Sequence, residues 1–151
     1  TPVAVVCAGA KALLDLPRTL EYLETRGVPV VCVGSDHFPA FWSRSSGLPA
    51  PLRLDGAAEI AGFMAARTRL GIAGGLVVAN PIPAEAEIPA AEMERHIAQA
   101  LVEAEAEGVS GKAVTPFLLS RILALTGGRS LAANIALVRS NAALAARLAG
   151  A

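Results

Sequence analysis

Aromatic residues are scarce in this chain of 151 residues: they make up 4% of it, although hydrophobic residues make up 54%. A core must therefore be built mainly from Ala, Val, Leu and Ile, and the length suits one domain, residues 1–151, without an internal boundary. No apolar run approaches the roughly 20 residues that a membrane span requires. The formal net charge is zero and no basic block occurs, which argues against nucleic acid or an anionic membrane as a partner.

Cysteine is also rare. Cys7 and Cys32 are too far apart for a metal knuckle or a redox pair, and two cysteines do not make a disulfide framework. We expect buried free thiols in a reducing cytoplasm. The first residues, 1–3, contain no basic region and do not resemble a signal peptide. The sequence has no initial Met and enters an apolar strand almost at once, as if it were part of a longer chain.

Lysine is the least used charged residue. Of thirteen basic residues only Lys11 and Lys112 are lysines, so positive charge is otherwise supplied by arginine. Lys11 follows a short apolar run and stands among small residues. Only a lysine amine can lose its proton and attack carbon, and burial or a neighbouring cation lowers the pKa of catalytic lysines. Lys11 is therefore a candidate nucleophile, and the alternative is a surface lysine that opens a helix.

The apolar pattern alternates between strands and helices. Short β-branched runs predict strands, and Gly, Pro and capping residues delimit the helices, with Asp15 as an N-cap and Ser130 as the cap of the last helix. The expected strands are 3–7, 28–33 and 75–79; the expected helices are 15–27, 57–70, 89–107, 115–126 and 130–151; and 43–56 is expected to be a loop.

Buried strands that alternate with helices predict an α/β fold, a three-layer α/β/α arrangement around a largely parallel sheet. Ligands of such sheets bind outside the carboxyl ends of the strands. The turns after the first and third strands, 9–11 and 80–83, are therefore the expected site. The turn 9–11 lacks the glycine spacing of a phosphate loop or a dinucleotide fingerprint.

Several polar residues have both a structural and a functional interpretation. Asn80 either presents its amide at a strand end or simply forms a turn with Pro81, and Lys112 lies in an expected flexible loop. His37 and His96 have no metal-ligating partners at suitable spacing. Trp42, the only tryptophan, is either a lid or a plug. These residues remain open from the sequence alone.

Asn134 stands one turn inside the last helix, among apolar and small residues, after a Gly127-Gly128 turn. An amide on such a face usually has a structural role and is hydrogen-bonded within the fold. It also offers the paired donor and acceptor that the edge of a nucleobase needs. Asn134 is therefore a candidate substrate-binding residue.

Five segments together resemble one family, the pseudouridine-5′-phosphate glycosidases, also called indigoidine-synthase-A-like proteins. The resemblance runs in order over nearly the whole chain and corresponds to the C-terminal half of a family member. The segments are 5–11 (VVCAGAK), 20–29 (LEYLETRGVP), 75–83 (GLVVANPIP), 111–119 (GKAVTPFLL) and 126–134 (TGGRSLAAN).

The resemblance implies an enzyme that reversibly splits the C–C glycosidic bond of pseudouridine 5′-phosphate, giving uracil and ribose 5-phosphate. It implies a homotrimer and a divalent metal, typically Mn²⁺. Lys11 corresponds to the lysine that bonds covalently to the sugar C1′, and Asn134 to an active-site asparagine near the base. The family's metal-binding Asp falls just upstream of Thr1, so no metal ligand is expected in this chain. A catalytic Glu and a second Lys fall further upstream.

This chemistry requires an amine. The leaving group of a C-glycoside is attached through carbon, so it has no glycosidic heteroatom that an acid could protonate. The two-carboxylate mechanism of most glycosidases therefore does not apply directly to this bond. An amine at C1′ can instead form an imine as the C–C bond breaks. Two alternatives remain: a synthase that forms C-glycosides on the same scaffold, and a sugar-phosphate-binding module without catalysis. Use of Lys11 where the chain elsewhere prefers Arg argues against the binding module.

Overall fold

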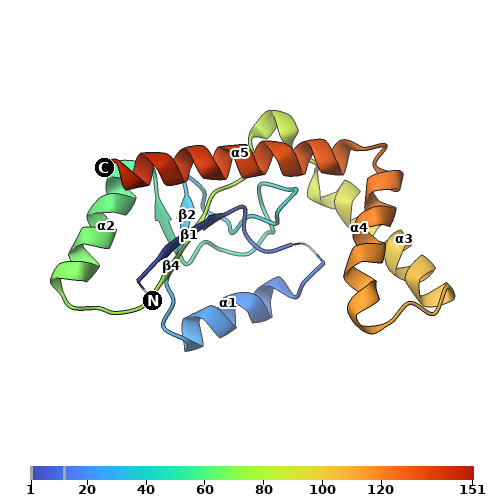
Figure 1. The fold of residues 1–151 in the computed structure, drawn as a ribbon, viewed down its shortest axis with the longest axis horizontal. Coiled ribbons are helices and arrows are strands. Elements are labelled where there is room, and N and C mark those ends of the chain that lie inside the picture. Colours follow the sequence, from blue (N-terminus) through green and yellow to red (C-terminus); the bar gives the residue numbers. More distant parts are fainter. Residues whose placement is uncertain (1, 12) are drawn as a thin grey trace.

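The computed structural model describes residues 2–11 and 13–151, which form a parallel sheet flanked by helices (Figure 1). The strands and helices agree with the expected elements to within one or two residues at most ends. The strands are β1 (Ala4–Cys7), β2 (Val30–Val33), β3 (Leu52–Leu54) and β4 (Leu76–Ala79). The α-helices are α1 (Leu16–Thr25), α2 (Ala57–Arg69), α3 (Ala90–Ala106), α4 (Val114–Leu125) and α5 (Arg129–Ala149), with 3-10 turns η1 (Ala84–Ala86) and η2 (Gly111–Ala113).

The strands lie in the order β1-β4-β2-β3, and all of them are parallel. β2 and β4 form the centre, and their β-branched residues are largely buried, as expected for a sheet covered on both faces. The expectation that 43–56 is entirely loop was wrong, because it contains β3. β3 has only three residues, with Arg53 more exposed than its neighbours, so it is too short to produce a recognisable periodic pattern.

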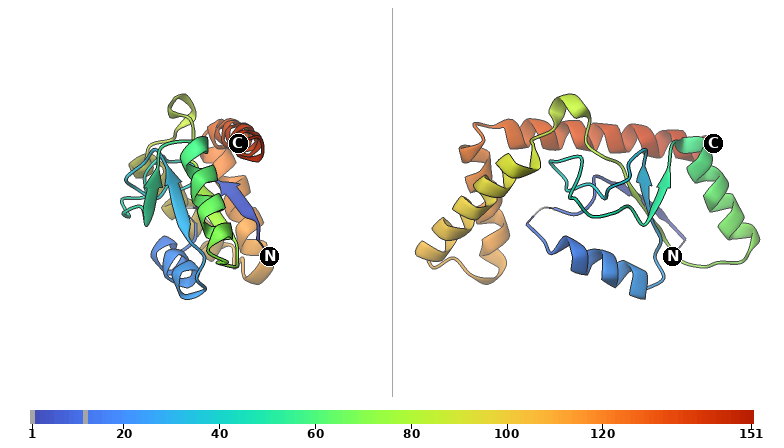
Figure 2. Two further views of the ribbon diagram at one scale, coloured as in Figure 1. Left: turned by 90° about the vertical axis from the view of Figure 1, so that its left-hand side faces the viewer. Right: turned by 180° about the vertical axis from the view of Figure 1, so that it is seen from behind.

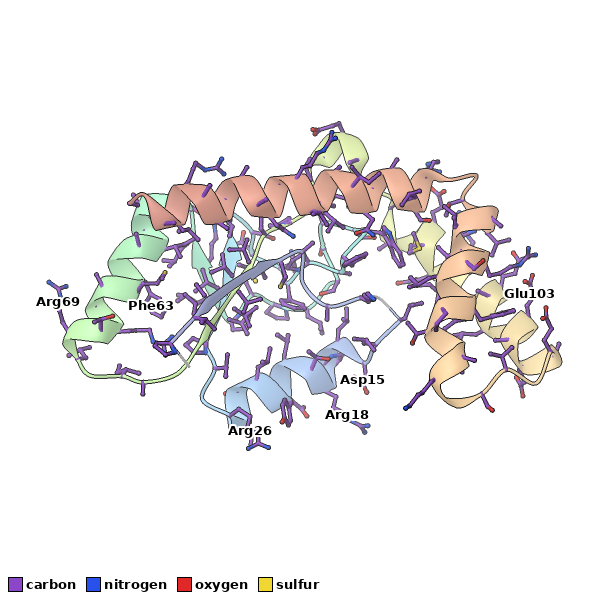
Figure 3. All side chains as sticks on the ribbon, viewed as in Figure 1. Asp15, Arg18, Arg26, Phe63, Arg69 and Glu103 are labelled. Carbon is purple, nitrogen blue, oxygen red and sulfur yellow. The ribbon has the colours of Figure 1, made fainter. Side chains whose placement is uncertain are left out.

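Helices cover both faces of the sheet, which confirms the three-layer α/β/α fold. Leu20 and Leu23 of α1 pack with Val30 and Cys32 on one face. The opposite face packs against α2 and α5; its core consists of Val31, Ile60, Leu76, Val78 and Leu144, with Phe63 packed against it. Figure 1 shows α1 and α5 on opposite sides of the strands, and in Figure 3 Phe63 projects from the side of α2 that faces the sheet.

A second core lies beyond the carboxyl ends of the strands. There α3, α4 and the first half of α5 pack around Trp42 and the segment after β4, while the second half of α5 continues over the sheet (Figure 2). With 21 residues α5 is about 30 Å long, enough to join both cores. Ile97 of α3 is buried here, whereas Leu101, one turn later in the same helix, is 48% exposed.

The helix ends follow local signals with one exception. The Asp15 carboxylate accepts the backbone N–H of Arg18 at 3.0 Å, which confirms Asp15 as the cap of α1 (Figure 3). Ser130 is not the cap of α5: the helix starts at Arg129 after Gly128, and Ser130 is buried in its first turn. The hydroxyl of Thr126 accepts the Ser130 N–H at 3.2 Å instead. None of the described helices is long and apolar enough to cross a membrane.

Candidate active site at the carboxyl ends of β1 and β4

The turns after β1 and β4, which the sequence gives as the expected site, start side by side. β1 and β4 are neighbouring strands, and the N–H of Asn80 donates to the carbonyl of Cys7 at 2.7 Å. This bond extends the pairing one step past β4. The turn that carries Lys11 therefore begins next to Asn80.

Lys11 is half-buried on this turn. Its carbonyl accepts the N–H of Leu14 at 2.9 Å, which closes a turn directly before α1. No carboxylate among residues 2–11 and 13–151 forms an ion pair with the Lys11 amine. The amine is thus not committed to a structural salt bridge within the part of the chain that is described.

The backbone before Lys11 is tightly packed against the segment after β2. Gly9 has a φ of +79° and forms an isolated bridge with Ala40. A Cβ added to Gly9 would lie 1.9 Å from the carbonyl oxygen of Pro39, so only glycine fits without movement of one backbone. The N–H of Phe41 donates to the carbonyl of Ala8 at 2.9 Å. This packing fixes the start of the Lys11 turn.

Asn80 is held by α5. Its Nδ2 donates to Ser140 Oγ and to Asn141 Oδ1, both at 3.0 Å. Both amide hydrogens are therefore used, and the carbonyl oxygen Oδ1 remains as a free acceptor that is not fully enclosed by described residues. Sequence reasoning missed Ser140 and Asn141. The available signal was Asn141 seven residues after Asn134, two helical turns along an otherwise apolar face.

Asn134 lies on α5 between Ala133, which is buried in the second core, and the exposed Ile135. The side chain is half-buried, and its amide makes no hydrogen bond to another described side chain or backbone group that would explain it as structure. Ala133 belongs to the same core cluster as Ala8, the residue that starts the Lys11 turn. The fold thus brings the Asn134 segment of α5 and the Lys11 turn against one core.

The two thiols are free. Cys32 is fully buried as expected, whereas Cys7 at the end of β1 is only half-buried. Burial raises the pKa of Cys32 to about 11, and repulsion from Cys7 adds to it. Burial also raises the pKa of Cys7, partly opposed by its hydrogen bond with the backbone of Gly9. Neither cysteine is therefore a reactive thiolate at neutral pH.

The sequence also left Lys112, His37, His96 and Trp42 open. Lys112 is exposed in η2, between α3 and α4. His37 is exposed, and His96 is half-buried with its Nε2 3.6 Å from the carboxylate of Glu92. Trp42 is 3% exposed and is a plug, not a lid. Among the described residues, no group of three or more His, Cys, Asp or Glu side chains could hold a metal ion.

The segment after Asn80 is anchored by the same region that packs on Gly9. Arg44 Nη1 donates to the Ile82 carbonyl at 2.6 Å, and the Arg44 N–H donates to the Glu87 carboxylate at 2.8 Å. Ser43 Oγ donates to the Ile88 carbonyl at 2.7 Å. Residues 39–41 therefore pack on the turn that carries Lys11, and Arg44 contacts the turn 80–83. The Ser43 hydroxyl bonds beyond both turns, at Ile88.

The chain is similar to several known proteins over nearly its whole length. A relative from Methylobacterium nodulans, named pseudouridine-5′-phosphate glycosidase, is 68% identical over 149 residues, which are 99% of this chain and 44% of the relative. One of the same name from Solibacter usitatus is 64% identical, over 99% of this chain and 50% of the relative. The chain thus spans about half the length of the curated relatives it matches.

Two crystal structures have the same fold. An indigoidine synthase A-like protein from Thermotoga maritima matches with a TM-score of 0.84 and 37% identity, over 99% of this chain and 49% of that one. A prealnumycin C-glycosynthase in complex with ribulose 5-phosphate matches with a TM-score of 0.86 and 33% identity, over 97% of this chain and 50% of that one. The family model described as indigoidine synthase A like protein matches residues 1–151, and the chain belongs to that family.

Proposed function

We propose that this chain supplies the imine-forming lysine of an enzyme that reversibly cleaves pseudouridine 5′-phosphate to uracil and ribose 5-phosphate. The observation that carries the proposal is the amine of Lys11. It lies on the turn after β1, which begins next to Asn80, and it has no ion-pair partner among the described residues. The names of relatives that are 58–68% identical support the choice of substrate.

In the proposed reaction the Lys11 nitrogen bonds to C1′ while the C1′–O4′ bond breaks, and O4′ takes a proton. Protonation of uracil at C5 then allows the C1′–C5 bond to break. The electrons of that bond stay with the base, and the lone pair of the Lys11 nitrogen forms the imine with C1′. Water adds to the imine and releases ribose 5-phosphate with the free amine. A Ser or Cys nucleophile could not form this imine.

Asn134 acts on the base in this proposal. An amide that has no structural partner can donate to a uracil carbonyl and accept from a ring N–H at the same time. A donor aimed at a uracil carbonyl favours the return of the bond electrons to the base as the C–C bond breaks. Asn134 thus orients uracil and supports its departure.

Manganese does not fit the described residues of this chain. They contain no group of three or more His, Cys, Asp or Glu side chains that could hold the ion, so no step of the reaction is assigned to a metal. By the family resemblance the metal ligand, a catalytic Glu and a second Lys belong to the other half of the family domain. We use "complete enzyme" for this chain joined to that half, and propose that it is a cytoplasmic homotrimer.

Borohydride reduction tests the proposal. The complete enzyme, incubated with pseudouridine 5′-phosphate and reduced, should carry a ribose phosphate adduct on Lys11, found by peptide mass spectrometry. Lys11→Arg keeps the charge but cannot form an imine, so it should lose both adduct and turnover while its circular dichroism stays unchanged. A Lys11→Arg enzyme with near-normal rates would disprove the covalent mechanism.

A second candidate function is the synthesis of a C-glycoside, favoured by the structural match to a C-glycosynthase. The same lysine imine would then accept attack by a different carbon nucleophile. The two functions differ in their acceptor. If ribose 5-phosphate couples to uracil more efficiently than to other aromatic acceptors, and pseudouridine 5′-phosphate is cleaved, the glycosidase is supported; preference for another acceptor supports the synthase.

A further inference from the structure

A strained turn contacts both the backbone that leads to Lys11 and the helical turn that carries Asn134. It runs from Pro39 to Trp42, and we name it the 39–42 turn. Phe41 in this turn has a φ of +64°, and among the described residues it is the one non-glycine with positive φ. That conformation costs about 1–2 kcal/mol for an L-residue and persists only where surrounding contacts enforce it.

The first contacts of the 39–42 turn are to the backbone that leads to Lys11. The Phe41 N–H donates to the Ala8 carbonyl at 2.9 Å, and Ala40 pairs with Gly9. The close approach of Gly9 to the Pro39 carbonyl leaves no room for even one added carbon between the two backbones. The turn and the start of the Lys11 segment must therefore move together.

The other contacts lead to α5. The Trp42 ring is buried and meets the Phe41 ring edge-on, with ring centroids 5.0 Å apart. Trp42 Nε1 donates to the carbonyl of Ser130 at 3.1 Å, across 88 residues of sequence. In an α-helix the carbonyl of residue 130 also accepts the N–H of residue 134. Trp42 is therefore hydrogen-bonded to the helical turn that carries Asn134.

We propose that Trp42 is a positioning residue that fixes Lys11 relative to Asn134 through the 39–42 turn. The inference rests on the proposed roles of these two residues. A covalent nucleophile and a group that stabilises the departing base must act on opposite ends of one C–C bond. An error of about 1 Å in such an arrangement can cost roughly 10²-fold in rate. The indole N–H sets this spacing, which explains a buried tryptophan in a chain that otherwise has few aromatic residues.

The test is Trp42→Phe in the complete enzyme, which keeps an aromatic ring and removes the N–H. We expect kcat to fall about tenfold or more while KM changes less than about threefold, because misplacement affects the transition state more than substrate binding. Rates are measured well below the melting temperature of the variant. If Trp42→Phe does not fold, replacement of Trp42 by 3-benzothienylalanine keeps the shape of the indole and removes only the donor.

Ser43→Ala is the matched control. It removes one buried hydrogen bond of the next residue, to the Ile88 carbonyl and not to α5. It should lower the melting temperature at least as much as Trp42→Phe and keep kcat within about twofold. An unchanged kcat in Trp42→Phe, or an equal loss of kcat in Ser43→Ala, would overturn the inference.

Borohydride trapping separates this inference from the proposed function. If the parent enzyme forms the Lys11 adduct and Trp42→Phe keeps full kcat, the inference alone fails. If the parent turns over without any Lys11 adduct, the proposed function fails and the inference fails with it.

Discussion

The side-chain amide of Asn80 donates to the side-chain carbonyl of Asn141 at 3.0 Å, which ties the carboxyl end of β4 to the middle of α5. Ser140 accepts the second amide hydrogen. This contact lies between Leu137, which packs in the second core, and Leu144, which packs on the sheet. It is therefore a polar link between α5 and the sheet at the point where the two cores meet.

We expect Asn80→Ala and Asn141→Ala each to lower the free energy of unfolding by about 1–3 kcal/mol, since each leaves a half-buried polar group without its partner. In a double-mutant cycle of the complete enzyme the two losses should overlap by about 1 kcal/mol, measured by urea denaturation. Strictly additive losses would show that the contact contributes nothing to stability.

Asn134→Ala should lower kcat by roughly 10²-fold or more, because it removes the donor to the departing base. The melting temperature should change little, since the Asn134 amide has no hydrogen-bond partner among the described residues. Steady-state kinetics and calorimetry of the complete enzyme measure both quantities. Normal kinetics with a large loss of melting temperature would assign Asn134 to structure instead.

Gly9 and Gly47 provide a matched pair, because their φ angles are +79° and +78°. Gly47→Ala meets nothing within 4 Å and should cost only the left-handed strain, about 1–2 kcal/mol. Gly9→Ala adds the clash with Pro39 and should cost at least about 2 kcal/mol more, with a large loss of turnover as the Lys11 turn shifts. Equal stabilities of the two variants would contradict the tight packing at Gly9.

Cys32 makes stability depend on pH in the alkaline range. Its pKa is about 11 in the folded chain against 9.0 for an ordinary thiol, so between these values the unfolded state binds fewer protons than the folded state. Stability is therefore complete below pH 9 and falls as pH rises towards 11, by on the order of 1–2 kcal/mol. Cys32→Ala should show a shallower decline over this window in urea denaturation, and identical slopes would exclude the thiol as the cause.

Much of this fold was predictable because its signals are local. The β-branched runs of β2 and β4 require a sheet covered on both faces, and Asp15 caps α1 as its position indicates. Ser130 was misassigned because the same residue type caps a helix or lies buried in its first turn. The choice depends on Thr126, whose hydroxyl accepts the N–H of Ser130 in the first turn of α5.

The site was predictable only in part. Parallel strands place their carboxyl ends at one edge, so the turns that carry Lys11 and Asn80 were expected at the same edge of the sheet. The partners of Asn80 and Trp42 did not, because they lie 60, 61 and 88 residues away in sequence. Such contacts depend on the placement of α5 over the sheet, and no local pattern in the sequence contains that placement.

The last prediction concerns the 151-residue chain alone. Among the described strands β1 lies at the edge of the sheet and is paired on one side only. Val3, just before it, and Val5, within it, are 50% and 52% exposed. An unpaired edge with exposed valines favours association with other chains, so we expect concentration-dependent oligomers in light scattering.

Catalytic groups that act as a unit are strongly non-additive, and by the family resemblance several of them belong to the other half. The chain alone should neither cleave pseudouridine 5′-phosphate nor bind Mn²⁺ tightly, and addition of the other half should restore both. Metal-dependent cleavage by the 151 residues alone would show that Lys11 and Asn134 already belong to a whole site.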